Sequence, residues 1–253
     1  MSDATLTCDA FLGGQLMIEQ PKRGYRAGID PVLLAASVTA TAGQSVLELG
    51  CGVGVAALCL AARVPGLDIT GVEVQPDYAA LAQRNAASNN LIFNVAIADL
   101  AKLPADLRQR RFDHVIANPP YFDRQTGPQA NNPGREVALG ETTPLEQWLE
   151  NARKRLRDGG RMTLIQRVDR LPACLAGLDH RMGSVIVRPL AARPGRPPEL
   201  FLLQATKGGR AKFRLLAPIH LHSGDAHSEG PKDYTATIAA VLSKSARLDA
   251  FSP

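Results

Sequence analysis

The chain has 253 residues, of which 45% are hydrophobic and 21% are charged, and its net charge is +5; this profile is typical of one folded globular domain and compatible with an anionic partner. Its four scattered cysteines form no C-x-x-C pair, which argues against a disulfide framework, and no apolar stretch approaches the roughly 20 residues needed to span a bilayer. Because the N-terminus also lacks the pattern of a signal peptide, we expect a cytoplasmic protein without a membrane partner.

Strand-like and helix-like patterns alternate along most of the chain. After an N-terminal arm over residues 1–24, Asp30 and Pro31 predict the start of a helix, with Asp30 as its N-cap. Strands are then predicted over residues 45–49, 68–73, 92–98, 112–117, 161–165, 184–188 and 200–206. Helices are predicted over residues 55–64, 76–88, 143–157 and 171–178, and Asp158-Gly159-Gly160 should end the third of these.

This order of elements predicts an α/β fold. Repeated strand-helix-strand units give a mostly parallel sheet with helices on both faces, and such sheets bind ligands at the carboxyl ends of their strands. The core should span residues 25–206, and residues 207–253 should form a C-terminal extension with one strand-like and one helix-like segment. Neither the arm nor the extension is large enough for a separate domain, so we expect a single domain over residues 1–253.

A glycine-rich turn follows the first predicted core strand. Glu48 lies near the end of this strand, and Gly50, Gly52 and Gly54 alternate in residues 50–54, which we call the glycine turn. Glycines at alternate positions give a tight turn free of side chains, where a nucleoside ligand can lie against the backbone. The spacing is G-x-G-x-G, which differs from the G-x-G-x-x-G of dinucleotide-binding proteins and makes an NAD-linked oxidoreductase the least favoured alternative.

Two acidic residues end the next two strands. Glu73 closes strand 68–73, where its carboxylate would accept hydrogen bonds from both hydroxyls of a ribose. Asp99 follows strand 92–98, where it would accept a hydrogen bond from an adenine amino group. Because these acids lie at the same sheet edge as the glycine turn, we predict a nucleoside-containing ligand there.

The fourth strand ends in Asn118-Pro119-Pro120-Tyr121, which we call the acceptor turn. Each proline holds the residue before it in an extended conformation and has no N–H of its own. The side-chain oxygen of Asn118 and the carbonyl of Pro119 would therefore be held as fixed acceptors, with the flat ring of Tyr121 beside them. Two fixed acceptors suit a planar amino group, because accepting both of its hydrogens frees the nitrogen lone pair for attack on carbon.

Together the glycine turn and the acceptor turn resemble class I S-adenosylmethionine-dependent methyltransferases. The resemblance implies a Rossmann-like fold with an antiparallel last strand, S-adenosylmethionine as the cofactor, and an amino group conjugated to a π system as the methyl acceptor. It implies that Glu48, the glycine turn and Asn118 lie near the cofactor, that Glu73 holds the ribose, and that the acceptor turn is catalytic.

Further stretches are similar to bacterial tRNA adenine-N6 methyltransferases that modify the anticodon loop of a valine tRNA. They include QPKRGYRAGIDPVLLA, NPPYFDRQTG and PGRPPELFLLQATKG. The resemblance implies a tRNA partner, and residues expected to contact the substrate are Arg26, Asp30, Tyr121, Arg193, Arg196, Lys207 and Arg210. The loop over residues 123–142 is expected either to gate the substrate or to be a plain surface loop.

Two alternatives remain open from the sequence. A glutamine-N5 methyltransferase of peptide release factors would share the acceptor turn, but such enzymes normally carry a helical N-terminal domain that the short arm does not provide. A non-catalytic protein that binds the cofactor would have no need for the two acceptors. No metal is expected, because His220 and His222 lack a third ligand at a recognisable spacing. The oligomeric state is not specified by the sequence.

Overall fold

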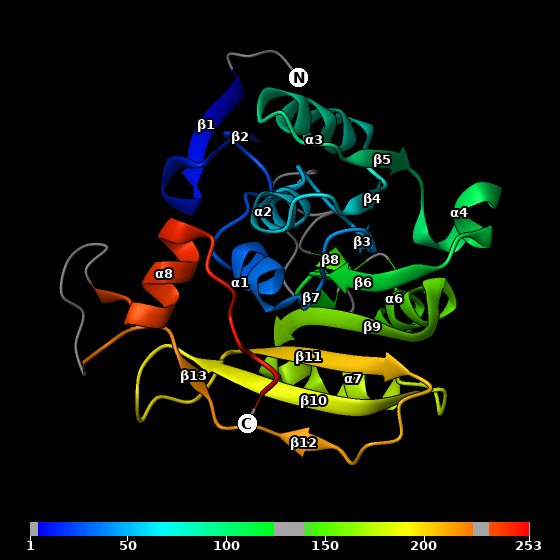
Figure 1. The fold of residues 1–253 in the computed structure, drawn as a ribbon, viewed down its shortest axis with the longest axis vertical. Helices are drawn as coiled ribbons and strands as arrows, with labels where there is room; N and C mark the ends of the chain where they lie inside the picture. Colours follow the sequence, from blue (N-terminus) through cyan, green and yellow to red (C-terminus); the bar gives the residue numbers. More distant parts are fainter. Residues whose placement is uncertain (1–4, 124–139, 142, 225–232, 253) are drawn as a thin grey trace.

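The computed structural model describes residues 5–123, 140–141, 143–224 and 233–252. A nine-stranded sheet lies at its centre, with the strand order β12-β10-β11-β9-β6-β3-β4-β5 and β13 paired beside β10 (Figure 1). The strands are β3 (Ser45–Leu49), β4 (Asp68–Glu73), β5 (Asn94–Ile97), β6 (Phe112–Ala117), β9 (Leu156–Arg167), β10 (Met182–Ala191), β11 (Leu200–Lys207), β12 (Arg214–Leu215) and β13 (Ile219–His220). Strands β3, β4, β5, β6 and β9 are parallel, whereas β11 is antiparallel to both β9 and β10.

Helices cover both faces of this sheet. The helices are α1 (Asp30–Ser37), α2 (Val55–Arg63), α3 (Pro76–Ser88), α4 (Ala105–Gln109), α6 (Leu145–Arg155), α7 (Leu171–Ala176) and α8 (Ala236–Lys244). Residues of α1, α2, α3 and α8 share one buried hydrophobic cluster, and residues of α4, α6 and α7 share a second. The two clusters lie on opposite faces of the sheet, which confirms the predicted α/β fold.

The junction of α6 and β9 differs from the prediction. Asp158-Gly159-Gly160 does not end the helix; α6 ends at Arg155 and β9 begins at once with Leu156. Leu156 pairs with Phe112 on β6, and both side chains are fully buried. Burying this pair draws the strand back to the helix end, and Gly159, with a φ of 76°, lies in the register shift that follows.

The N-terminal arm forms a hairpin that the sequence analysis did not predict. Strands β1 (Leu6–Phe11) and β2 (Leu16–Pro21) are antiparallel and are joined by the short 3-10 helix η2 (Leu12–Gly14). Two amides of α3 bind the backbone of β2. Asn85 accepts from the Glu19 amide at 2.8 Å and donates to its carbonyl at 3.1 Å, and Asn89 does the same for Met17 at 2.9 and 2.8 Å. These amides complete the edge of β2 much as a neighbouring strand would.

The C-terminal extension packs back on the core. Arg188 of β10 donates to the carbonyls of Ala217, Ala250 and Ser252, and the Leu248 amide donates to Ala36 at the end of α1. Helix α8 lies against η2 of the hairpin (Figure 1). None of the helices in the described part of the chain has the length and apolar character that crossing a membrane requires.

Candidate functional site

A cavity lies at the carboxyl ends of β3, β4 and β6, where the sequence analysis places a ligand. Most of the predicted site residues line it together: Glu48, Gly50, Gly52, Glu73, Asp99, Asn118, Pro119, Pro120 and Tyr121. Gly54 does not line the cavity; it has a φ of 90° and precedes α2, where a Cβ would lie 3.1 Å from the Phe93 ring. The fold thus brings the glycine turn and the acceptor turn, about 65 residues apart in sequence, to one cavity.

The glycine turn needs its glycines for two different reasons. Gly50 and Gly52 have φ values of 63° and 54°, a region that L side chains rarely adopt. At Gly50 a Cβ would also lie 2.4 Å from the indole ring of Trp148, whereas at Gly52 nothing lies within 4 Å of such an atom. Trp148 therefore closes one side of the turn, and Gly52 leaves the other side open for a ligand to approach the backbone.

These two glycines give a matched pair of variants. We expect Gly50→Ala to be the more destabilising, because it combines left-handed strain of about 1–2 kcal/mol with overpacking of about 1–3 kcal/mol against Trp148. Gly52→Ala should show the strain alone. Urea unfolding of both variants measures the difference. Equal free energies of unfolding would mean that the indole moves away without cost.

Two buried carboxylates hold the backbone around the turn. Glu48 accepts from the Ala57 amide at 2.9 Å, and Glu73 accepts from the Gly52 amide at 2.8 Å and the Gln75 amide at 2.9 Å. Burial, opposed by the hydrogen bond from Ala57, raises the pKa of Glu48 to about 8, and burial also raises the pKa of Glu73. A positively charged ligand would stabilise the ionised form of these two carboxyl groups and so lower their pKa values again.

The raised pKa of Glu48 predicts a pH effect on folding stability. A carboxyl whose folded pKa lies above its unfolded value contributes stability that is complete below the unfolded pKa, near 4.5, and is lost as pH rises towards about 8. We therefore expect the wild type to lose stability relative to Glu48→Gln over this range. Urea unfolding of both proteins at several pH values measures this difference in the free energy of unfolding. A difference that does not change with pH would contradict the raised pKa of Glu48.

Asp99 serves as a helix cap at the cavity wall. Its side chain accepts from the Ala101 amide at 2.8 Å and starts the 3-10 helix η3 (Leu100–Lys102). Asp99 also lines the cavity. It is therefore both the cap of η3 and a residue at the place where the sequence predicts an acceptor for an adenine amino group. A carboxylate has more acceptor sites than the single bond to Ala101 uses.

The acceptor turn has one unpaired acceptor. Asn118 Oδ1 is buried and has no hydrogen-bond partner among the described residues. The Pro119 carbonyl, in contrast, accepts from Gln166 Nε2 at 3.2 Å, so only one of its two lone pairs remains available. A buried amide oxygen without a donor is costly, and because Asn118 is one of the residues that line the cavity, a ligand is the expected source of the donor.

Asp30 does not act as a helix cap, which corrects the sequence prediction. Ile29 is the N-cap residue of α1, and Asp30 lies in the first turn beside Pro31. The Asp30 carboxylate instead accepts a hydrogen bond from the Tyr121 hydroxyl. Asp30 therefore lies behind the acceptor turn and is not among the residues that line the cavity.

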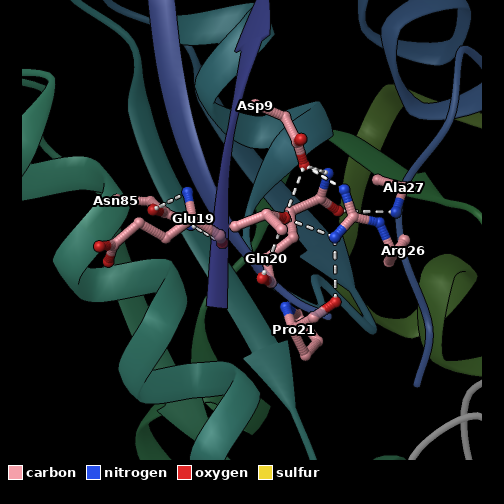
Figure 2. Close-up of polar contacts among 8 residues, drawn as sticks. Asp9, Glu19, Gln20, Pro21, Arg26, Ala27 and Asn85 are labelled. Carbon is pink, nitrogen blue, oxygen red and sulfur yellow. Dashed lines mark hydrogen bonds and ion pairs between the residues drawn. The ribbon is translucent and has the colours of Figure 1, made fainter. Parts of the chain in front are cut away.

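Arg26 binds the hairpin and not the cavity. Figure 2 shows its guanidinium donating to Asp9 at 2.6 Å and to the Pro21 carbonyl at 3.1 Å. Gln20 links the same parts, because it donates to Asp9 and accepts from the Ala27 amide, both at 2.8 Å. These bonds fix the segment that follows β2, in which Tyr25 and Ala27 line the cavity. Arg26 thus shapes the cavity wall from outside.

The other predicted cations are spread over two edges of the sheet. Arg193 is only 4% exposed and pairs with Asp233, so it ties the extension to the β10–β11 loop. Lys207 is the last residue of β11. Because β11 is antiparallel to β9, Lys207 lies at the edge of the sheet where β9 begins, and its Nζ donates to the Leu156 carbonyl. Arg210 follows three residues later at the same edge. Of the predicted cations, Arg196 alone is exposed in a loop at the carboxyl edge of the sheet, the loop between β10 and β11.

Several cavity residues were not predicted. Tyr25, Tyr78 and Trp148 line the cavity, and the Tyr78 hydroxyl accepts from the Tyr25 amide at 3.2 Å. Trp148 lies in the helix predicted over residues 143–157, but nothing in the sequence signals that this helix meets the glycine turn. The loop over residues 123–142, expected either to gate the substrate or to be a plain surface loop, lies almost wholly outside the described residues. Over the described ranges, no three side chains form a metal-binding group.

Comparison with known proteins agrees with this geometry. A family model described as a methyltransferase small domain matches residues 29–185. The tRNA1(Val) (adenine(37)-N6)-methyltransferase of Porphyromonas gingivalis is 32% identical over 206 residues, which cover 77% of this chain and 79% of that protein. The protein of the same name from Haemophilus influenzae is 33% identical over 160 residues, with 61% of this chain and 67% of that one covered.

Solved structures share the fold. A protein from Agrobacterium tumefaciens, described as a predicted O-methyltransferase, has a TM-score of 0.69 and 26% identity, with 87% of this chain and 98% of that one covered. The 16S rRNA N2 methyltransferase RsmC of Thermus thermophilus, solved with AdoMet and guanosine, has a TM-score of 0.55 and 21% identity, with 80% and 50% covered. At that identity the second likeness concerns the fold alone.

Proposed function

The chain belongs to the methyltransferase small-domain family and is an S-adenosylmethionine-dependent methyltransferase, and from this premise we propose that it methylates the exocyclic N6 amino group of an adenine in the anticodon loop of a valine tRNA. The observation that carries the proposal is that Asn118 lines the cavity and has a buried Oδ1 without a hydrogen-bond partner among the described residues. The names of the relatives support the choice of tRNA and of adenine N6.

The cavity residues fit the cofactor. Glu73 would hold the ribose hydroxyls, Asp99 would accept from the adenine amino group, and Glu48 would lie with the open side of Gly52 beside the methionine part. A ligand that carries a sulfonium and an ammonium group would stabilise the ionised form of the two carboxyl groups whose pKa values burial raises. When bound, S-adenosylmethionine supplies a methyl group on positively charged sulfur, which requires alignment more than further activation.

The acceptor turn would then activate the amine. Asn118 Oδ1 would accept one amino hydrogen and the free lone pair of the Pro119 carbonyl the other, while the adenine stacks on Tyr121. As the nitrogen becomes tetrahedral and gains positive charge, each of these hydrogen bonds strengthens and would then contribute roughly 1.5–3 kcal/mol, the value for a bond to a charged group. A hydroxyl group has only one hydrogen to donate, so two fixed acceptors distinguish this site from that of an enzyme that methylates a hydroxyl oxygen.

The remaining parts of the chain would support tRNA binding as one unit. We propose that residues 1–253 act as a single domain, in which the hairpin shapes the cavity and Arg196 contacts phosphates near the carboxyl edge. An anticodon loop suits the cavity, because its bases are unpaired or easily turned outward. A tRNA substrate also implies a cytoplasmic site of action.

The proposal is tested with purified protein and labelled S-adenosylmethionine. Separate reactions contain total tRNA, ribosomal RNA, DNA and peptide release factor, and nucleoside mass spectrometry identifies the product. We expect N6-methyladenosine in tRNA and none in the other pools. Label in the release factor but not in tRNA would show instead that the methyl acceptor is a glutamine side chain.

A further inference from the structure

The acceptor turn is held by two side chains that lie outside the motif. Gln166, near the end of β9, approaches it from the neighbouring strand, and Asp30, in the first turn of α1, approaches the ring of Tyr121. Neither residue is among those that line the cavity. Both side chains therefore reach the acceptor turn from outside the lining of the cavity.

Both polar atoms of the Gln166 side-chain amide form hydrogen bonds, and its NH2 group binds the two prolines. Its Nε2 donates to the carbonyls of Pro119 and Pro120, both at 3.2 Å, and its Oε1 accepts from the Arg167 amide at 2.8 Å. The residue is 0% exposed, so no water competes for these bonds. An amide NH2 has two hydrogens, and here each has a carbonyl oxygen. The bond to Pro119 fixes the plane of that carbonyl and so the direction of its remaining lone pair.

Asp30 fixes the aromatic end of the turn. It accepts the hydrogen bond of the Tyr121 hydroxyl, and burial together with the Asp30 carboxylate raises the pKa of Tyr121. The Asn118 side chain acts in the opposite sense on this pKa, as a donor to the phenol oxygen does. Asn118 Oδ1 is left without a hydrogen-bond partner among the described residues.

We infer that Gln166 and Asp30 are positioning residues, which set the two amine acceptors and the stacking ring of the acceptor turn before the substrate binds. The inference rests on the proposed function for its catalytic consequence. Prolines remove the local donors that would otherwise hold these carbonyls, so the restraint has to come from distant side chains. A misplacement of about 1 Å in such a site lowers the rate on the order of 100-fold.

Two substitutions at Gln166 test this inference. Gln166→Leu removes both donors and should lower kcat by about 10- to 100-fold with a smaller change in KM. In Gln166→Glu only a protonated carboxyl retains a donor, and burial raises its pKa into the assay range. This variant should therefore recover kcat as the pH is lowered from 9 to about 6, relative to wild type at each pH.

Gln204→Glu is the matched control. Gln204 lies on the adjacent strand β11, is also buried, and pairs with Thr163, three residues before Gln166 on β9. It should lose stability without a new pH dependence of kcat. A folded Gln166→Leu protein with wild-type kcat, or a Gln204→Glu protein with the same pH profile as Gln166→Glu, would overturn the role of Gln166.

Asp30 is tested by a conservative rescue. Asp30→Ala should lower kcat by about tenfold, whereas Asp30→Asn keeps an acceptor for the Tyr121 hydroxyl and should retain most activity. Asp77→Asn is the control, because Asp77 has the same place beside a proline in the first turn of α3, and this variant should keep wild-type kcat. Equal activity of Asp30→Ala and Asp30→Asn would remove Asp30 from this role.

A second readout does not depend on the substrate. Fluorine NMR of protein labelled with 3-fluorotyrosine, with Tyr121→Phe to assign the signal, reports the surroundings of Tyr121. The Tyr121 resonance should shift in Asp30→Ala and Gln166→Glu and stay in place in Gln204→Glu. If no tRNA is methylated, this result still decides the positioning role; an unshifted resonance in both variants would refute it.

Discussion

Replacing Asn118 by alanine is expected to lower kcat for methyl transfer by about 100- to 1,000-fold, the loss typical of one preorganised group that strengthens its bond in the transition state. Cofactor affinity should stay nearly unchanged, because Asn118 Oδ1 has no partner in the cavity wall and its donor is expected to be the amine. Single-turnover rates with tRNA measure the first effect, and calorimetry with S-adenosylmethionine measures the second.

Two further variants make this test specific. Asn118→Asp keeps an acceptor oxygen at the same position and should retain more activity than Asn118→Ala. Asn94→Ala changes an exposed asparagine on β5, away from the cavity, and should behave as wild type. A loss of cofactor affinity that parallels the loss of kcat in Asn118→Ala would mean that Asn118 holds the cofactor and not the amine.

Glu73→Ala should lower the affinity for S-adenosylmethionine by about 10- to 100-fold, since a hydrogen bond to a charged group contributes roughly 1.5–3 kcal/mol. Each carboxylate oxygen of Glu73 accepts one backbone amide, from Gly52 or Gln75, and has lone pairs left for ribose hydroxyls. Isothermal titration calorimetry of both proteins gives the change.

The loss in Glu73→Ala has to be separated from local unfolding. The variant also frees the amides of Gly52 and Gln75, so its melting temperature should fall, and binding is measured well below that temperature. Adenosine, which carries the ribose, should lose as much affinity as the complete cofactor. Unchanged adenosine binding would place the ribose elsewhere in the cavity.

The elements that form the cavity were predictable because their signals are local. Residues 45–49, 68–73 and 112–117 are apolar runs bounded by turn residues, and the structure has β3, β4 and β6 at those residues. Helix α3 also matches residues 76–88, because Pro76 marks its first turn. Parallel pairing of these strands then brings their polar ends to one edge, which is why Glu73 and Asn118 could be placed together.

The features that were missed depend on contacts between distant residues. The hairpin is held by Asn85 and Asn89, more than 60 residues further along the chain. The exposed arginine expected at position 193 is buried because Asp233, 40 residues later, compensates its charge. Gln166 lies near the end of β9, directly after Leu164 and Ile165, and the carbonyls that it binds lie 46 and 47 residues earlier in the chain. No local pattern of hydrophobicity or spacing encodes such pairs.

The contact between the hairpin and α8 has a consequence for synthesis of the protein. A Cβ at Gly13 would lie 2.5 Å from the Ser243 carbonyl oxygen, and Ser245 donates to Gln15 at 2.8 Å. The hairpin is thus supported by a helix that is synthesised after the whole core. Because Arg26 and Gln20 anchor the cavity wall to this hairpin, a nascent chain arrested before α8 would capture the cofactor poorly, and the enzyme becomes competent only after α8 has been made.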